Sequence, residues 1–163
     1  MTWLKRIGCG VLIFVIASVI YVAVADSGFV SVEYAESPNA DHEALRQSLS
    51  EWGAFDDAAA DIDAVFLVPR DLRIAFADCG QPNAYYDPAQ TAIVMCYELV
   101  SQLANDYRRS APSEETLAAS VWQTTFFVFY HELGHALIDM LDLPVTGREA
   151  VSYTHLTLPT NRE

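Results

Sequence analysis

Two histidines and a glutamate that lie close together in this sequence could form a catalytic zinc site. They are His131, Glu132 and His135, in the run His-Glu-Leu-Gly-His. Residues four apart lie on one face of an α-helix, so both imidazoles can reach the same metal ion. Glu132 stands beside the first histidine and could accept a proton from a water molecule that zinc activates. The pattern predicts metal-assisted hydrolysis, with two histidine ligands and a glutamate as general base.

The residues around this motif are apolar, which favours a functional role for its polar side chains. Residues 128–130 and 136–138 are apolar or aromatic, and Leu133 and Gly134 carry no charge. A helix that is apolar around most of its circumference is buried. Buried polar groups are costly unless they have partners, and a metal ion is one such partner. The alternative is a core helix whose polar side chains are only hydrogen-bonded.

A catalytic zinc site normally has three protein ligands, so a further ligand is expected after the motif. The candidates are Glu149 and His155. Asp139 and Asp142 lie nearer, and Asp139 could instead orient a ligand histidine. We favour Glu149 as the candidate third ligand.

His155 is disfavoured because of the segment that contains it. Residues 151–163 resemble the translated read-through of a sequencing adapter, and the helical periodicity stops before them. We therefore expect the native sequence of this fragment to end near Ala150, with the lower part of the domain missing. The alternative is a natural, polar C-terminal tail.

The elements that must position the motif are short strands and amphipathic helices, which together indicate an α+β domain. Apolar residues at helical spacing predict helices over residues 41–60, 97–107 and 115–141, the last carrying the motif. Alternating or compact apolar runs predict strands over residues 30–34, 64–68, 72–77, 84–86 and 92–96. We expect a linker with a short strand (26–40), a domain (41–150) and an artefactual tail (151–163).

Residues 1–25 have the features of a targeting segment. Lys5 and Arg6 precede an apolar run, and an Ala-Val-Ala sequence at residues 23–25 offers a cleavage site. Residues 7–25 are also long enough for a membrane anchor. A cleaved signal peptide and a retained anchor both stay open, and the alanine pattern favours cleavage. In either case we expect the domain outside the cytoplasm, in the periplasm or secreted.

Export would give a role to Cys79 and Cys96, the only cysteines beyond that segment. An oxidising compartment favours a disulfide between them. A loop of this size is stabilised by about 3 kcal/mol in the chain-entropy model. Metal binding by this pair is a weaker alternative, because the spacing resembles no zinc motif.

The composition limits the partners. The chain has 163 residues and a formal net charge of −13, and Lys5 is its only lysine. Without a basic patch it cannot follow a phosphate backbone, so nucleic acid is excluded as a partner. A peptide or protein substrate is expected, with membrane contact only through residues 7–25 if they are retained.

The run from Phe127 to Asp139 resembles a family of bacterial zinc metallopeptidases long described only as a domain of unknown function. Residues 79–80, 83–88 and 96–99 fit the same family pattern, and the resemblance covers about residues 40–150. It implies a zincin-like, small gluzincin fold with an N-terminal helix, a small mixed sheet and a long active-site helix. It also implies one zinc ion on His131 and His135, with Glu132 as the base that hydrolyses peptide bonds. Glu149 matches the start of the family's glutamate-bearing second helix, and the sequence departs from the pattern from Val151 onward.

Asn83, Tyr85 and Tyr86 are candidates for the rim of a substrate cleft. In zinc peptidases a strand commonly pairs with an extended substrate, and either tyrosine could donate a hydrogen bond to a developing oxyanion. Simple packing within a hairpin is the plainer interpretation of these aromatic residues. Two other functions stay open: a non-catalytic exported module that uses the same scaffold for binding, and a zinc amidase that acts on a non-peptide substrate.

Overall fold

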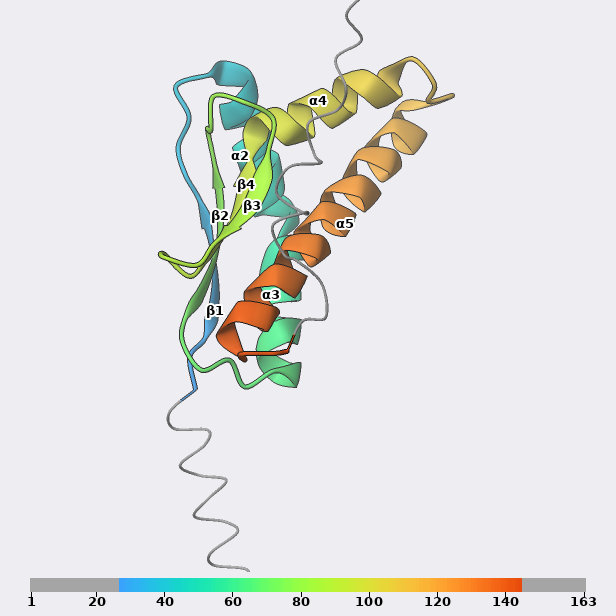
Figure 1. Ribbon diagram of the computed structural model, residues 1–163. Helices are drawn as coiled ribbons and strands as arrows, with labels where there is room; N and C mark the ends of the chain where they lie inside the picture. Colours follow the sequence, from blue (N-terminus) through green and yellow to red (C-terminus); the bar gives the residue numbers. More distant parts are fainter. Residues whose placement is uncertain (1–26, 145–163) are drawn as a thin grey trace, which may run out of the picture.

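The computed structural model describes residues 27–144, which form a four-stranded sheet with helices packed on one side (Figure 1). The strand order is β1-β2-β4-β3, in which β1, β2 and β4 are parallel and β3 is an antiparallel edge strand. The described residues therefore form an α+β fold with a small mixed sheet, as expected, and they contain four helices where three were predicted. In chain order the elements are β1 (Val30–Tyr34), α2 (Ala40–Trp52), α3 (Ala54–Val65), β2 (Leu72–Ala77), β3 (Ala84–Asp87), β4 (Ala92–Cys96), α4 (Tyr97–Arg108) and α5 (Glu114–Met140).

The core lies between the sheet and the helices. Along β2, buried residues alternate with half-buried ones, so one face of the sheet is covered and the other is open. Phe55 of α3 contacts Phe76 of β2 and Phe129 of α5, with ring centroids 4.8 and 5.5 Å apart, and all three side chains are fully buried. This aromatic cluster fixes α5, and the motif on it, against the sheet.

The long helix α5 presents a continuous buried stripe to the core. Ser113 caps its N-terminus, because the Ser113 hydroxyl accepts a hydrogen bond from the N–H of Thr116. The buried positions recur every three or four residues, which is the spacing of one helix face. They are Leu117, Val121, Thr125, Phe129, Glu132, Leu133, Ala136 and Met140.

Two predictions of secondary structure were wrong. The helix expected over residues 41–60 is divided at Gly53 into α2 and α3. Gly53 has a positive φ of 69°, caps the C-terminus of α2 and precedes the first residue of α3. The strand expected over residues 64–68 does not form, because Val65 ends α3 and the next residues are a connection in which Val68 alone is buried. A short apolar run cannot by itself distinguish a strand from the end of a helix.

The short strand expected within residues 26–40 is β1, and it belongs to the sheet. It pairs in parallel with β2 from Val30 opposite Leu72 to Tyr34 opposite Phe76. Just before it, the N–H of Gly28 donates to the carbonyl of Val68 at 2.7 Å. A Cβ at Gly28 would lie 2.1 Å from the main-chain carbon of Arg70, so this close approach requires glycine.

The predicted disulfide between Cys79 and Cys96 is present, and it joins the turn after β2 to the end of β4. The Glu98 carboxylate supports the same turn, because it accepts the N–H groups of Cys79 and Gly80 at 3.1 and 2.7 Å. Gly80 has a φ of 75°, which glycine adopts without strain. These links hold the connection that leads into β3.

Within residues 27–144, none of the helices combines the length and apolar character that a membrane crossing requires. The predicted targeting segment, Glu149, His155 and the tail lie outside the described residues.

Candidate metal centre

The two histidines of the motif converge on one point beside α5. Their Nε2 atoms are 3.2 Å apart, and their rings are nearly perpendicular, with an interplanar angle of 84°. Two imidazole nitrogens on one tetrahedral zinc ion, each at about 2.0–2.1 Å, lie about 3.3–3.4 Å apart. The donor atoms of His131 and His135 therefore fit a shared zinc ion with almost no rearrangement. His131 is exposed and His135 half-buried, so the point where they meet is open to solvent.

Glu132 lies on the buried stripe of α5, between the histidines and the sheet. Its side chain is almost fully buried, at 3 % exposure, and its Oε2 accepts the main-chain N–H of Tyr86 at 3.1 Å. Burial raises the pKa of Glu132, against the opposing effects of His135, His131 and the Tyr86 N–H. A carboxylate with a raised pKa is a stronger base than an ordinary glutamate, which suits it to accept a proton. The alternative interpretation from the sequence was a core helix whose polar side chains are only hydrogen-bonded. Glu132 fits it in part, because it has a hydrogen-bond partner within the protein.

The free edge of β3 runs beside the motif. The N–H of Cys96 donates to the carbonyl of Asn83, so Asn83 faces β4. In an antiparallel strand the main-chain groups of successive residues point to opposite sides, which directs those of Ala84 and Tyr86 away from β4. The hydrogen bond from Tyr86 to Glu132 agrees with this geometry. The edge that could pair with another strand therefore borders the candidate site.

Tyr86 also contacts α5 through its side chain. Its hydroxyl donates to Asp139 at 2.8 Å, and Arg70 donates to the same carboxylate oxygen at 2.5 Å. Burial, followed by the Asp139 carboxylate, raises the pKa of Tyr86 above its ordinary range. Because Glu132 and Asp139 lie two turns apart with His135 between them, Tyr86 fixes the strand to the helix on both sides of that histidine. No local sequence pattern pointed to this network.

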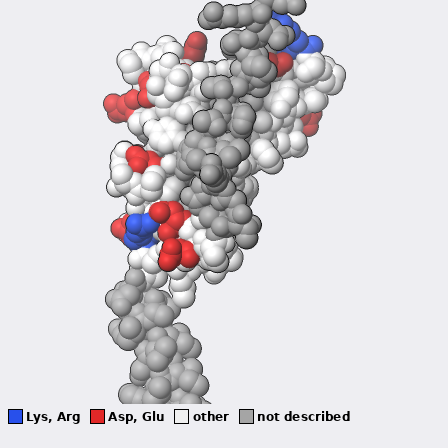
Figure 2. Space-filling view, in the orientation of Figure 1, with Lys and Arg blue, Asp and Glu red and all other residues white. Residues whose placement is uncertain are grey.

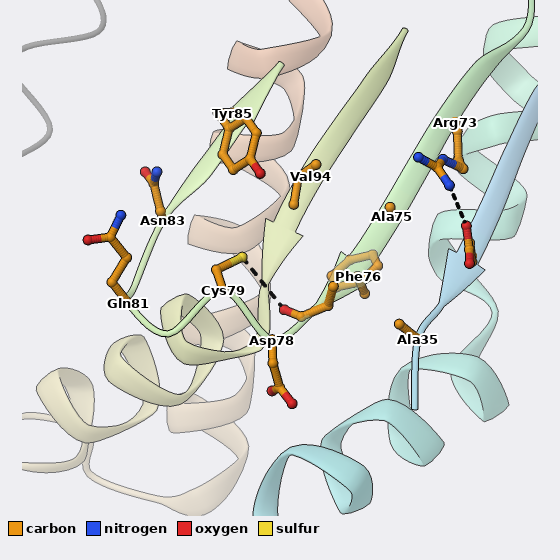
Figure 3. Close-up of a pocket in the computed structure, with 12 residues that line it drawn as sticks. Ala35, Arg73, Ala75, Phe76, Asp78, Cys79, Gln81, Asn83, Tyr85 and Val94 are labelled. Atoms are coloured by element: carbon orange, nitrogen blue, oxygen red, sulfur yellow. Dashed lines mark hydrogen bonds and ion pairs between the residues drawn. The ribbon is translucent and has the colours of Figure 1, made fainter. Parts of the chain in front are cut away.

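The three rim candidates do not lie together. Tyr86 is buried against α5, whereas Tyr85 is partly exposed on the opposite face of the sheet. Tyr85 and Asn83 line a hollow of about 370 Å³ on the face that the helices leave open, over Ala75 and Val94 (Figure 3). This arrangement directs Asn83 and Tyr85 away from the two histidines.

A third zinc ligand is not found near the histidines within the described part of the chain. The groups of three potential ligands with donor atoms within 4.8 Å of one another, among residues 27–144, include neither His131 nor His135. The hydrogen bonds of Asp139 go to Tyr86 and Arg70. Glu149, the predicted third ligand, lies outside the described residues.

A second polar cluster, not foreseen from the sequence, lies where β2 and β4 end. His42 Nδ1 is 2.6 Å from an Asp78 oxygen, and the Ser37 hydroxyl donates to the other oxygen at 2.6 Å. The Ser37 hydroxyl, together with His42 and against the effect of burial, holds the pKa of Asp78 below its usual value. Glu98 is nearby, with both its oxygens bonded to main-chain N–H groups. These side chains satisfy one another and hold the ends of the strands together.

The sequence matches one family model. Residues 34–152 match the family DUF4344, described as "Putative metallopeptidase". This stretch begins at the last residue of β1 and contains every later strand and helix. No curated protein and no solved structure matches the chain. The matched stretch covers most of the sequence and contains the two histidines and Glu132, so the chain belongs to this metallopeptidase family.

Proposed function

We propose that this chain is the catalytic region of an exported zinc-dependent peptidase, with His131 and His135 as zinc ligands and Glu132 as general base. One observation carries the proposal: the two Nε2 atoms converge at 3.2 Å beside a carboxylate that is almost fully buried. A module that only binds a partner would gain nothing from a buried, desolvated carboxylate at that position. Glu149 remains the candidate third ligand.

The fold supports a zincin-like architecture. A mixed sheet with an antiparallel edge strand lies against a long helix that carries the motif, and the free edge of β3 borders that motif. We propose that an extended peptide substrate adds to this edge. Ala84 is only 6 % exposed there, so its main-chain N–H and C=O must be uncovered when the substrate pairs with the strand. Pairing of this kind would recognise the peptide backbone, which favours a peptide over another amide as substrate.

The residues of the chain then have distinct roles in hydrolysis. When bound, zinc acts as a Lewis acid that polarises the scissile carbonyl and acidifies a water molecule. Glu132 accepts the proton of that water and passes it to the leaving amine. The N–H of Tyr86 holds Oε2 of Glu132, which leaves Oε1 for the proton.

The test is a comparison of zinc content and casein hydrolysis between the protein and its Glu132→Gln variant. We expect both proteins to hold one zinc ion and the variant to lose activity by about 100-fold or more. Glu115→Gln, an exposed carboxylate in the first turn of the same helix, is the matched control and should keep full activity. Equal hydrolysis by the Glu132→Gln variant would remove Glu132 from the mechanism.

A further inference from the structure

Four large apolar side chains are exposed together at one end of the domain. Phe29, Val65, Phe66 and Leu67 are 56 %, 72 %, 37 % and 57 % exposed, and we call them the apolar end. They come from two segments: the residue before β1, and the last residue of α3 with the connection that follows it. Both segments lie at the lower end of the view in Figure 1.

Main-chain hydrogen bonds hold these two segments side by side. The N–H of Gly28 donates to the carbonyl of Val68 at 2.7 Å, and the N–H of Leu72 donates to the carbonyl of Phe29 at 3.0 Å. Asp71 accepts the N–H of Phe29 at 3.2 Å. The exposed side chains therefore project from neighbouring segments whose backbones are held together. Contiguous exposed apolar patches usually mark a surface that contacts another body.

The segment that precedes Ser27 in the sequence indicates what this surface contacts. The apolar run of residues 7–25 ends two residues before Ser27, and it is long enough to cross a bilayer. If this run is retained as an anchor, the four residues 26–29 that follow it can extend at most about 14 Å. Phe29 would then lie at or near the membrane surface, with Val65, Phe66 and Leu67 next to it.

We propose that the apolar end inserts into the interfacial layer of the bilayer in which residues 7–25 are anchored, so that the domain rests on the membrane in one orientation. This inference goes beyond the peptidase function and does not depend on it. It favours the retained anchor over the cleaved signal peptide, because a released domain would leave these side chains in water.

Charge defines the kind of lipid surface. Asp61, Asp63 and Asp71 are exposed around the apolar end. The cation beside them, Arg70, is paired with Asp139. On the face of the domain shown in Figure 2, acidic side chains outnumber basic ones. The whole chain has 22 acidic residues against 9 lysines and arginines. Anionic lipid would therefore repel this end, and the contact must come from burial of apolar side chains. We commit to a zwitterionic surface, such as phosphatidylcholine.

The test uses the full chain in phosphatidylcholine vesicles, with Cys9→Ser to remove the unpaired thiol. A polarity-sensitive fluorophore is placed on Leu67→Cys and, as a matched control, on Ser110→Cys in the exposed turn between α4 and α5. We expect a blue-shifted emission at position 67 that spin-labelled lipid quenches and aqueous iodide does not, and the reverse at position 110. Equal iodide quenching at both positions would overturn the proposal, and so would protection of position 67 only when another protein is added.

A second measurement addresses the anchor itself. The mass of the protein recovered from the membranes of expressing cells should include residues 1–25. A soluble product that begins at Asp26 would contradict the proposal, whatever the labelled protein does in vesicles. The double variant Val65→Ser, Leu67→Ser changes only exposed positions and should fold normally. A fluorophore on Phe66→Cys should be protected from iodide in the otherwise unchanged chain and quenched by iodide in the double variant.

Discussion

The hydroxyl of Tyr86 ties the edge strand to the helix that carries the candidate metal site, and Tyr86→Phe removes that bond alone. The tyrosine is 4 % exposed, so its hydroxyl cannot turn to bulk water. A hydrogen bond to a charged group contributes about 1.5–3 kcal/mol. Asp139 is 41 % exposed in its side chain and keeps Arg70 as a partner, so water can partly replace the lost hydroxyl. We therefore expect a loss at the lower limit, about 1.5 kcal/mol in the free energy of unfolding.

Urea denaturation measures this loss, and a double-mutant cycle assigns it to the contact. The midpoint should fall with no change in the slope of the transition, and the melting temperature should fall by about 6 °C. In the cycle of Tyr86→Phe with Asp139→Ala, the coupling energy should be about 1.5 kcal/mol. In the cycle of Tyr107→Phe with Asp139→Ala it should be near zero, because the Tyr107 hydroxyl bonds to Thr124 instead. A coupling energy for Tyr86 and Asp139 within about 0.5 kcal/mol of zero would refute the reasoning, since independent sites add to that accuracy.

Three further predictions concern the structure around the site. Replacing both Cys79 and Cys96 by alanine should lower the free energy of unfolding, measured in urea, by about 3 kcal/mol. Reductant should lower the free energy of unfolding of the wild-type chain by the same amount and should have no effect on the variant. Phe129→Ala, at a fully buried position, should cost about 3–5 kcal/mol, whereas Phe127→Ala, at a position 74 % exposed, should change stability by less than about 0.5 kcal/mol; equal losses would show that the helix is oriented differently. Burial opposes the charge of Glu98, but hydrogen bonds from main-chain N–H groups, first that of Cys79, hold the pKa of Glu98 below the ordinary 4.5. The charged carboxylate therefore stabilises the fold above pH 4.5, and this stabilisation is lost as the pH falls through the lowered pKa. Glu98→Gln should therefore reduce stability at neutral pH by about 1 kcal/mol or more and flatten its decline in acid, and an unchanged acid transition would contradict this role.

The strands that the sequence predicted best are those whose signals are local. Residues 72–77 and 92–96 have compact or alternating apolar patterns that end at turns, and the structure places β2 and β4 at those positions. Gly53 is a possible helix end, but the apolar residues keep their helical spacing on both sides of it, so the spacing predicts one continuous helix. The strand prediction for residues 64–68 was wrong because the end of α3 and the residues after it, Val65, Phe66 and Leu67, are as apolar as a strand although they are exposed. Burial depends on the rest of the fold, and no short window of sequence contains it.

The same division applies to the candidate site. The spacing of His131 and His135 is a property of one helix, so the convergence of their imidazoles could be predicted from the sequence. The contacts of Tyr86 could not, because the residues it bonds lie 46 and 53 positions along the chain. The separate directions of Tyr85 and Tyr86 follow from the alternation of a strand, but which of the two faces the helix is decided by the packing of the whole sheet. Glu149 stays a prediction.

The measurement that tests the central claim most directly is a calorimetric titration of the full chain with zinc, compared with its His131→Asn, His135→Asn and His155→Asn variants. If the two histidines of α5 hold the metal, the wild-type chain and the His155 variant bind one zinc ion with equal affinity. Each of the other two variants should lose more than the roughly tenfold to hundredfold in affinity that removal of an outer-shell partner costs. Zinc binding that is unchanged by His131→Asn and His135→Asn would contradict the account.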